Sequence, residues 1–357
     1  MKPKAKLTVA DIGEQGLLAK LHRFCPPDIV GDDAAVIDWH RDHSLVVTTD
    51  VLVDGVHFSD GMAQPAVHTT TPQDIGWRAV AANLSDLAAM GATPRGITVG
   101  LSLPKTVPVI WVEQLYEGLS ECLQQYQAAL WGGDVTGSSL VTVAITAIGK
   151  VKPQRVIRRQ NAQVGDAILV TGEHGASRAG LELLLHPERQ SELDSLSCQH
   201  LIRAHQRPQP RFDVLPMLWD VLPDFRVGGM DSSDGLADAI LQICRASGVG
   251  AKINLDALPI PQALSQWVSP EQAMEWALYG GEDYELVLTL PWQAAEQLQQ
   301  ELGYGAKIIG EIIADQKVEG MSDALKESSR LDFGGGFQHW GIIVISPLIL
   351  PLILQLG

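Results

Sequence analysis

The sequence lacks the motifs that mark the common nucleotide-binding and hydrolytic sites. It contains no G-x-x-x-x-G-K-[ST] segment and no G-x-G-x-x-G segment that opens a helix after a strand, which disfavours P-loop and Rossmann nucleotide sites. H-E-x-x-H and G-x-S-x-G are also missing, which weakens metalloprotease and serine-hydrolase interpretations. Any phosphate chemistry in this chain must therefore use a different kind of site.

Cysteine and positive charge are also scarce. The four cysteines lie far apart, without the C-x-x-C spacing of a zinc site, and we expect buried, reduced thiols at Cys25, Cys122, Cys198 and Cys244. Only 26 Lys and Arg residues stand against 42 Asp and Glu residues, which gives a formal charge of −16. Because this balance opposes binding to nucleic-acid phosphates, no nucleic-acid partner is expected.

Long apolar runs are absent except near the C-terminal end. Ile342–Leu354 is almost entirely apolar but is interrupted by Pro347 and Pro351, and it is shorter than the roughly 20 residues of a membrane-spanning helix. Packing of residues 341–357 on the body or on a partner is favoured over contact with a membrane. The basic N-terminus precedes no apolar signal segment, so we expect a cytoplasmic protein without a membrane span.

The order of apolar and polar residues predicts a mixed α/β (α+β) protein with two domains. Its length of 357 residues exceeds the usual size of a single core. Strands are expected at 45–49, 96–103, 141–151 and 167–171, and helices at 74–90, 111–127, 175–185 and 235–247. The arginine-rich segment 152–165 is the expected connection. We therefore divide the chain into domains 1–154 and 155–340, followed by the apolar tail 341–357.

Six short acidic segments, each expected where a strand or a helix stops, are the most informative feature of the sequence. They are Gly31-Asp32-Asp33, Thr48-Thr49-Asp50, Asn83-Leu84-Ser85-Asp86, Gly132-Gly133-Asp134, Asp231-Ser232-Ser233-Asp234-Gly235 and Gly280-Gly281-Glu282-Asp283. One such segment alone is more often a turn or a helix cap. Six together indicate a shared site, because crowded carboxylates repel one another unless a cation such as Mg²⁺ binds between them.

In this order, the segments resemble those of the thiamine-monophosphate kinase family. The resemblance continues through Gly55-Val56-His57-Phe58, Leu87-Ala88-Ala89-Met90-Gly91 and Tyr284-Glu285-Leu286, and it covers residues 10–340. It implies the fold shared with aminoimidazole ribonucleotide synthetase, in which the N-terminal domains pair as a homodimer. It also implies an ATP- and Mg²⁺-dependent kinase that converts thiamine monophosphate directly to thiamine diphosphate in thiamine diphosphate biosynthesis.

The resemblance also implies roles for individual residues of this sequence. Several Mg²⁺ ions would be held by Asp33, Thr48, Thr49, Asp50, Asp86, Asp134, Asp231 and Asp234, and three of these, Asp50, Asp134 and Asp234, are assigned to catalysis. ATP would contact Tyr116, Gly133, Asp134, Arg159 and Ser233, and thiamine monophosphate would contact His57, Glu282 and Phe337. Arg158 is the alternative to Arg159, and Trp340 is the alternative to Phe337. Asp32 is a weaker candidate metal ligand than its neighbour Asp33. A purely structural role stays open for Tyr116 and His57.

The expected reaction is an in-line phosphoryl transfer in which bound cations offset the repulsion between donor and acceptor phosphates. The acceptor phosphate has a second pKa of about 6, so no protein general base is expected. Two rival hypotheses remain. The first is another enzyme of the same superfamily, such as an aminoimidazole ribonucleotide synthetase or a selenophosphate synthetase. A selenophosphate synthetase would carry a reactive cysteine or selenocysteine in an N-terminal glycine-rich loop, which this sequence does not show. The second is a nucleotide- or thiamine-binding regulator that has kept the fold but lost catalysis, which would bind ATP with Mg²⁺ without releasing ADP.

Overall fold

The N-terminal half of the chain folds around a five-stranded sheet. The computed structural model describes residues 35–40, 42–63, 66–223, 226–322 and 327–330. The strands, in their order across the sheet, are β1 (Ala35–His40), β2 (His43–Val53), β5 (Thr142–Val151), β3 (Thr93–Leu103) and β4 (Ala129–Gly137). β3 and β4 run parallel, and the other neighbours are antiparallel. β4 is therefore an edge strand.

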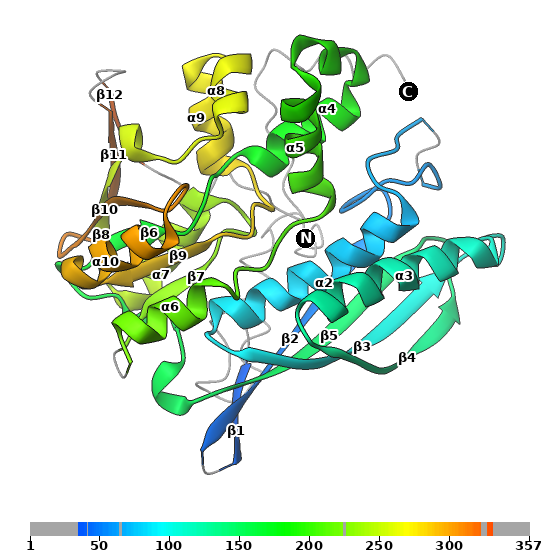
Figure 1. The fold of residues 1–357 in the computed structure, drawn as a ribbon, viewed down its shortest axis with the longest axis horizontal. Helices are drawn as coiled ribbons and strands as arrows, with labels where there is room; N and C mark the ends of the chain where they lie inside the picture. Colours follow the sequence, from blue (N-terminus) through cyan, green and yellow to red (C-terminus); the bar gives the residue numbers. More distant parts are fainter. Residues whose placement is uncertain (1–34, 41, 64–65, 224–225, 323–326, 331–357) are drawn as a thin grey trace, which may run out of the picture.

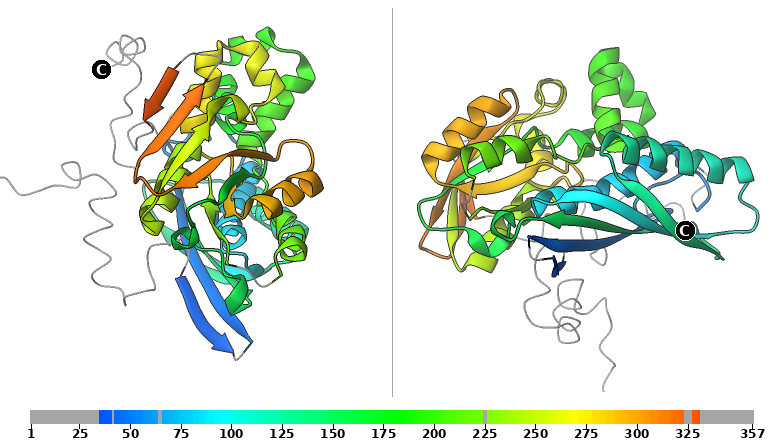
Figure 2. Two further views of the ribbon diagram at one scale, coloured as in Figure 1. Left: turned by 90° about the vertical axis from the view of Figure 1, so that its left-hand side faces the viewer. Right: turned by 60° about the horizontal axis from the view of Figure 1, so that its bottom comes forward.

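Two helices, α2 (Pro72–Ala89) and α3 (Val109–Gln125), cover one face of this sheet (Figure 1 and Figure 2). Alternate side chains of β5 point to that face, and Ile145 is fully buried there with Leu84 of α2 and Leu119 of α3. No described helix covers the opposite face, where the intervening side chains are exposed or half-buried. One face thus carries the core, and the other is open to contacts.

The C-terminal half folds around a seven-stranded sheet in the order β12-β11-β8-β10-β6-β9-β7. Its strands are β6 (Ala167–Val170), β7 (Gly228–Asp231), β8 (Gly250–Asn254), β9 (Leu286–Leu290), β10 (Lys307–Ile313), β11 (Val318–Ser322) and β12 (Glu327–Arg330). Adjacent residues of β6 serve different cores. Leu169 packs with α6 (Val214–Val221) and α10 (Trp292–Leu302), and Ile168 packs with α7 (Leu236–Ser247). Helices therefore lie on both faces of this sheet (Figure 1).

Four further helices pack together beside the junction of the two halves. They are α4 (Ala176–Leu185), α5 (Ser195–Gln206), α8 (Gln262–Trp267) and α9 (Pro270–Tyr279). Short 3-10 helices complete the elements: η2 (Pro153–Arg155), η3 (Arg159–Asn161), η4 (Pro187–Glu192) and η5 (Leu255–Ala257). The chain passes from the first sheet to the second through η2 and η3. α2 contacts both β2 and β7, so it belongs to both sides of the junction.

The expected helices and strands form within a few residues of their predicted bounds, but the placement of three acidic segments at the ends of elements is wrong. Thr48–Asp50 lies inside β2, which continues through Val51 and Val53 because these residues also favour extended backbone. Asn83–Asp86 lies inside α2, which ends only at Ala89. Gly132–Asp134 lies inside β4, where it pairs with residues 98–100 of β3.

Cys122, Cys198 and Cys244 are buried and free, as predicted. Several other predictions fall outside the described residues, namely those for Cys25, Asp32, Asp33, Phe337, Trp340 and the tail 341–357. Within the described ranges, no helix has both the length and the apolar character needed to cross a membrane.

Candidate active site

β2 and α2 bring the first candidate ligands together. Alternate side chains of a strand point to opposite faces, and Thr48 points to the face covered by α2. Its hydroxyl donates a hydrogen bond to a carboxylate oxygen of Asp86, near the C-terminal end of α2. Thr49 points the other way, and its hydroxyl bonds that of Thr146 at 2.8 Å on the open face. Thr48 and Asp86 therefore belong to one cluster, and the side chain of Thr49 does not.

Asp50 and Asp231 extend this cluster across the junction. The backbone N–H of Asp50 donates to Oδ1 of Asn83 at 3.1 Å, which ties β2 to α2. The carboxylate of Asp231 accepts from the hydroxyls of Ser85 at 2.6 Å and Ser233 at 3.0 Å. Burial raises the pKa of Asp231; its serine donors oppose that shift, and the negative charge of Asp50 adds to it. The two carboxylates are thus close enough to repel each other.

This donor set fits a hard divalent cation. No three His, Cys, Asp or Glu side chains of the described residues converge tightly enough to hold a metal ion by themselves. Mg²⁺ does not need such a group, because it usually binds one or two carboxylates and completes its shell with waters and phosphate oxygens. A cation near Asp50 and Asp231 would also relieve their repulsion. The residues therefore fit Mg²⁺ that binds together with a polyphosphate.

Gly133 and Asp134 do not join the cluster within one chain. Asp134 lies on β4 at one end of a row of paired residues that runs across the sheet through Gly100 and Ala144 to Val51. Three strand spacings separate the two ends of this row, a distance of about 14 Å. A Cβ on Gly100 would meet the Cβ of Ala144 on the open face, so the exposed side chain of Asp134 also points to that face.

Arg159 acts electrostatically on the acidic cluster, and its guanidinium donates a hydrogen bond to the side-chain carbonyl of Gln242 at 2.5 Å. Its positive charge acts to lower the pKa of Asp231, against the dominant effect of burial. The backbone of the neighbouring Arg158 pairs with β7. Ser233 and Asp234 follow Asp231 in the same half-buried loop. The charge of Arg159 and the hydroxyl of Ser233 both favour the ionised carboxylate of Asp231.

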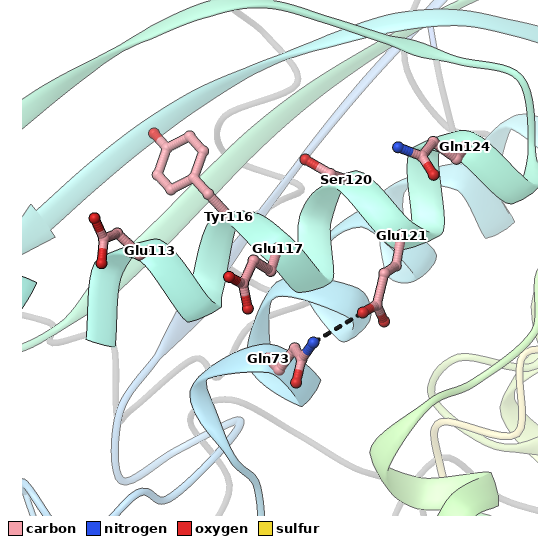
Figure 3. Close-up of a pocket in the computed structure, with 7 residues that line it drawn as sticks. All are labelled: Gln73, Glu113, Tyr116, Glu117, Ser120, Glu121 and Gln124. Carbon is pink, nitrogen blue, oxygen red and sulfur yellow. Dashed lines mark hydrogen bonds between the residues drawn. The ribbon is translucent and has the colours of Figure 1, made fainter. Parts of the chain in front are cut away.

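Tyr116 lines a separate surface pocket over α2 and α3 (Figure 3). The pocket measures about 720 Å³, and its lining consists of Gln73, Glu113, Tyr116, Glu117, Ser120, Glu121 and Gln124. Gln73 donates a hydrogen bond to Glu121 at 2.8 Å across it. Tyr116 also packs against the N-terminal core. None of Asp50, Asp86 and Asp231 lines this pocket, so Tyr116 and the acidic cluster are not brought together within one chain.

The two candidate substrate residues that the structure describes lie on loops joined by Arg78. Its guanidinium donates to the carboxylate of Glu282 at 2.5 Å and to the backbone C=O of His57 at 3.3 Å. Nδ1 of His57 accepts from the backbone N–H of Val53 at 3.0 Å. The N–H of Glu282 donates to the C=O of Ser233 at 2.7 Å. The candidate acceptor site is therefore adjacent to the candidate ATP loop.

Several side chains that support the site were not predicted from the sequence. Asn83 and Ser85 stood in an acidic segment, and their amide and hydroxyl groups were the available signal. No pattern marked Arg78 or His174. Nε2 of His174 lies 3.2 Å from the hydroxyl of Ser232, and burial lowers the pKa of His174 to about 4, so its ring is neutral at physiological pH.

Asp283 makes the stability of the protein depend on pH. Its carboxylate accepts from the backbone N–H groups of Gly175 at 2.7 Å and Ser177 at 2.9 Å, yet burial raises its pKa to about 7. Between about pH 4 and pH 7 the folded protein keeps a proton that the unfolded chain has released, so the free energy of unfolding falls as pH rises and then levels off.

Asp283→Asn cannot release this proton, so its Tm is expected to fall less than that of the wild type between about pH 5 and pH 8. The variant's Tm should be lower at every pH, because its amide NH₂ faces one of the two backbone N–H donors. Only the slope of Tm against pH therefore tests the prediction. Thermal melts across this range provide the measurement, and equal slopes would contradict the prediction.

Two family descriptions match this chain. The N-terminal domain of AIR synthase related protein matches residues 31–151, and the C-terminal domain of AIR synthase related protein matches residues 163–323. A solved structure of AaThiL complexed with AMPPCP and TMP has a TM-score of 0.79 and 29% identity, over 94% of this chain and 99% of its own. A structure of E. coli HypE, at 20% identity and a TM-score of 0.64, shares the fold. The predicted mixed α/β fold with two domains of this type is confirmed.

Similarity to curated proteins is higher. The thiamine-monophosphate kinase of Synechococcus elongatus is 50% identical over 93% of this chain and 98% of its own length. The thiamine-monophosphate kinase of Escherichia coli K12 is 39% identical over 82% of this chain and 85% of its own length. Together with the site geometry, these matches show that the chain belongs to the thiamine-monophosphate kinase family.

Proposed function

We propose that this protein transfers the γ-phosphoryl group of ATP to the phosphate of thiamine monophosphate, forming thiamine diphosphate and ADP. The observation that carries the proposal is the convergence of Asp50 from β2, Asp86 from α2 and Asp231 from β7 at one junction. Family membership supports it, since the thiamine-monophosphate kinase of Synechococcus elongatus matches 93% of the chain and a relative was solved with AMPPCP and TMP.

The carboxylates at the junction would hold Mg²⁺ beside the phosphates. The proposed protein ligands are Asp33, Thr48, Thr49, Asp50, Asp86, Asp134, Asp231 and Asp234. When bound, Mg²⁺ supplies positive charge that offsets the repulsion between donor and acceptor phosphates. The chain prearranges this site, because Thr48 orients Asp86, and Ser85 and Ser233 orient Asp231.

The remaining residues bind and align the two substrates. Arg159 is proposed to pair with phosphate oxygens of ATP. The bond from Glu282 N–H to Ser233 C=O sets the spacing between the ATP loop and the acceptor loop. His57 and Glu282, with Phe337, would contact the thiamine part. No side chain has to remove a proton, because the acceptor phosphate is already ionised near neutral pH. A cytoplasmic location is proposed from the sequence alone.

We also propose a homodimer in which the open faces of two N-terminal sheets meet. Among the described residues, β2 pairs with β1 only as far as Val47, and β4 is an edge strand. Exposed apolar side chains lie on the same strands: Val51 is 46% exposed, Leu130 40%, Trp131 54% and Val135 60%. Edge strands that carry exposed apolar groups are typical of interfaces.

A two-fold axis between the sheets would place β4 of one subunit along the part of β2 after Val47 in the other. Asp134 of the partner subunit would then supply the ligand that lies too far away within one chain. The same arrangement would explain why both Asp134 and Thr49 point to the open face.

The test of the proposed function is product formation by the purified protein. Incubation with ATP and Mg²⁺ is expected to yield thiamine diphosphate and an equal amount of ADP with thiamine monophosphate, and neither product with thiamine or buffer. Binding of ATP without ADP release would instead favour a regulatory protein of the same fold.

A further inference from the structure

Arg78 occupies a buried position at the junction that neither the sequence nor the family resemblance assigned to the site. It lies on α2, and its side chain is only 2% exposed. Its guanidinium donates to the carboxylate of Glu282 and to the backbone C=O groups of His57 and His205. One side chain thus joins the loop after β2, the end of α5 and the loop before β9.

The environment of Glu282 shows what this contact does. The side chain of Glu282 is 28% exposed, so its carboxylate remains reachable although Arg78 is not. Glu282 has a φ of 69°, and nearby Tyr284 has a φ of 54°. L-residues rarely adopt this left-handed backbone, and such residues persist where surrounding contacts enforce them. The ion pair with Arg78 is such a contact.

The charges at this position also depend on Arg78. Burial acts to raise the pKa of Glu282, but Arg78, with smaller effects of His205 and His57, holds the pKa below its usual range. Nδ1 of His205 lies 3.6 Å from the second carboxylate oxygen. Burial, followed by the charge of Arg78, lowers the pKa of His205 to about 3, so its ring is neutral at physiological pH. Of these two residues, Arg78 therefore carries the positive charge beside Glu282.

We propose that Arg78 is a positioning residue for the acceptor substrate, which fixes Glu282 and the His57 loop relative to each other across the junction. Arg78 does not touch the substrate itself; it acts through these two residues. Its planar fork can hold a carboxylate oxygen and two backbone carbonyls at once, which the single ammonium of lysine does with less geometric control. The inference rests on the proposed function and adds a determinant of acceptor affinity to it.

The experiment compares Arg78→Met and Arg78→Lys with the wild type in steady-state thiamine diphosphate formation and in calorimetric titration with thiamine monophosphate. We expect Arg78→Met to raise KM and Kd for thiamine monophosphate about tenfold or more, since misplacement of positioning groups carries penalties of this size. KM for ATP should stay within about twofold, because the carboxylate cluster remains in place. Arg78→Lys should recover part of the lost affinity.

Arg207→Met is the matched control. Arg207 also binds α2 across the junction, through Asp74 at 2.7 Å, and it pairs with Glu121 at 2.7 Å. Its loss removes a partly buried ion pair but leaves Glu282 and His57 in place. We expect a lower Tm with an unchanged KM for thiamine monophosphate. An equal rise in KM in both variants would show a general loss of packing and overturn the proposal.

Glu282→Gln and the double variant Arg78→Met/Glu282→Gln keep the proposal testable if Arg78→Met does not fold, because the double variant leaves no unpaired charge. If Arg78 acts through Glu282, its replacement raises KM much less in the Glu282→Gln background than in the wild type. Additive effects, or unchanged acceptor affinity in every Arg78 variant, would overturn it. A wild-type protein that makes no thiamine diphosphate would reject the proposed function instead.

Discussion

Replacing Asp50 with asparagine is expected to lower kcat by about 10²–10³-fold while the fold stays intact, a loss typical of removing one preorganised charge-stabilising group. The backbone bond from Asp50 N–H to Asn83 does not depend on the side chain and should persist. Removing the charge also relieves its repulsion with Asp231, whose pKa Asp50 helps to raise. The Tm should therefore stay the same or rise although turnover collapses.

The measurement combines thiamine diphosphate formation at saturating substrates with thermal melts in the presence and absence of Mg²⁺. Mg²⁺ should raise the Tm of the wild type by mass action on the folded state, and it should raise that of Asp50→Asn less. Asp315→Asn is the control, because Asp315 forms an exposed ion pair with Lys317 at 3.4 Å. Near-normal turnover in Asp50→Asn would remove Asp50 from the cation site.

The local sequence pattern was sufficient to predict most helices and strands, because the spacing of apolar residues shows which face of an element is buried. The periodicity behind the predicted helix 74–90 is real, and the structure extends it to Pro72 because Thr71 and Asp74 form a capping box. Acidic and glycine residues, by contrast, were interpreted as ends of elements. Asp86 lies within α2 and Asp134 within β4, since a functional carboxylate can occupy any position whose side chain faces the site.

Relations between distant segments could not be predicted from local pattern. Asp86 and Thr48 meet because of the register between α2 and β2, and the family order of motifs was the only sequence signal for it. Arg78 resembled any other polar residue of a helix, and its role depends on a loop 204 positions away. The left-handed backbone of Glu282 was also invisible, because residue type alone favours other conformations there.

The structure also separates two proposed ligands, Asp50 and Asp134, that the sequence placed in one set. Asp50 and Asp134 lie about 14 Å apart across three strand spacings and point to opposite faces of the sheet. If Asp134 of the partner subunit completes each site, Asp50→Asn and Asp134→Asn should each be nearly inactive alone. Mixed dimers of the two variants would contain one intact site and one site that lacks both carboxylates.

Equal mixing of the two inactive variants, followed by subunit exchange, should therefore restore about a quarter of wild-type turnover, because about half of the dimers are mixed and each has one complete site. Differently tagged subunits and native mass spectrometry would confirm that exchange occurred. Mixing Asp50→Asn with a tagged copy of itself is the control and should restore nothing. If exchanged dimers stay inactive, Asp134 does not complete the partner's site, because only a site shared between subunits can be rebuilt from two chains that are each defective.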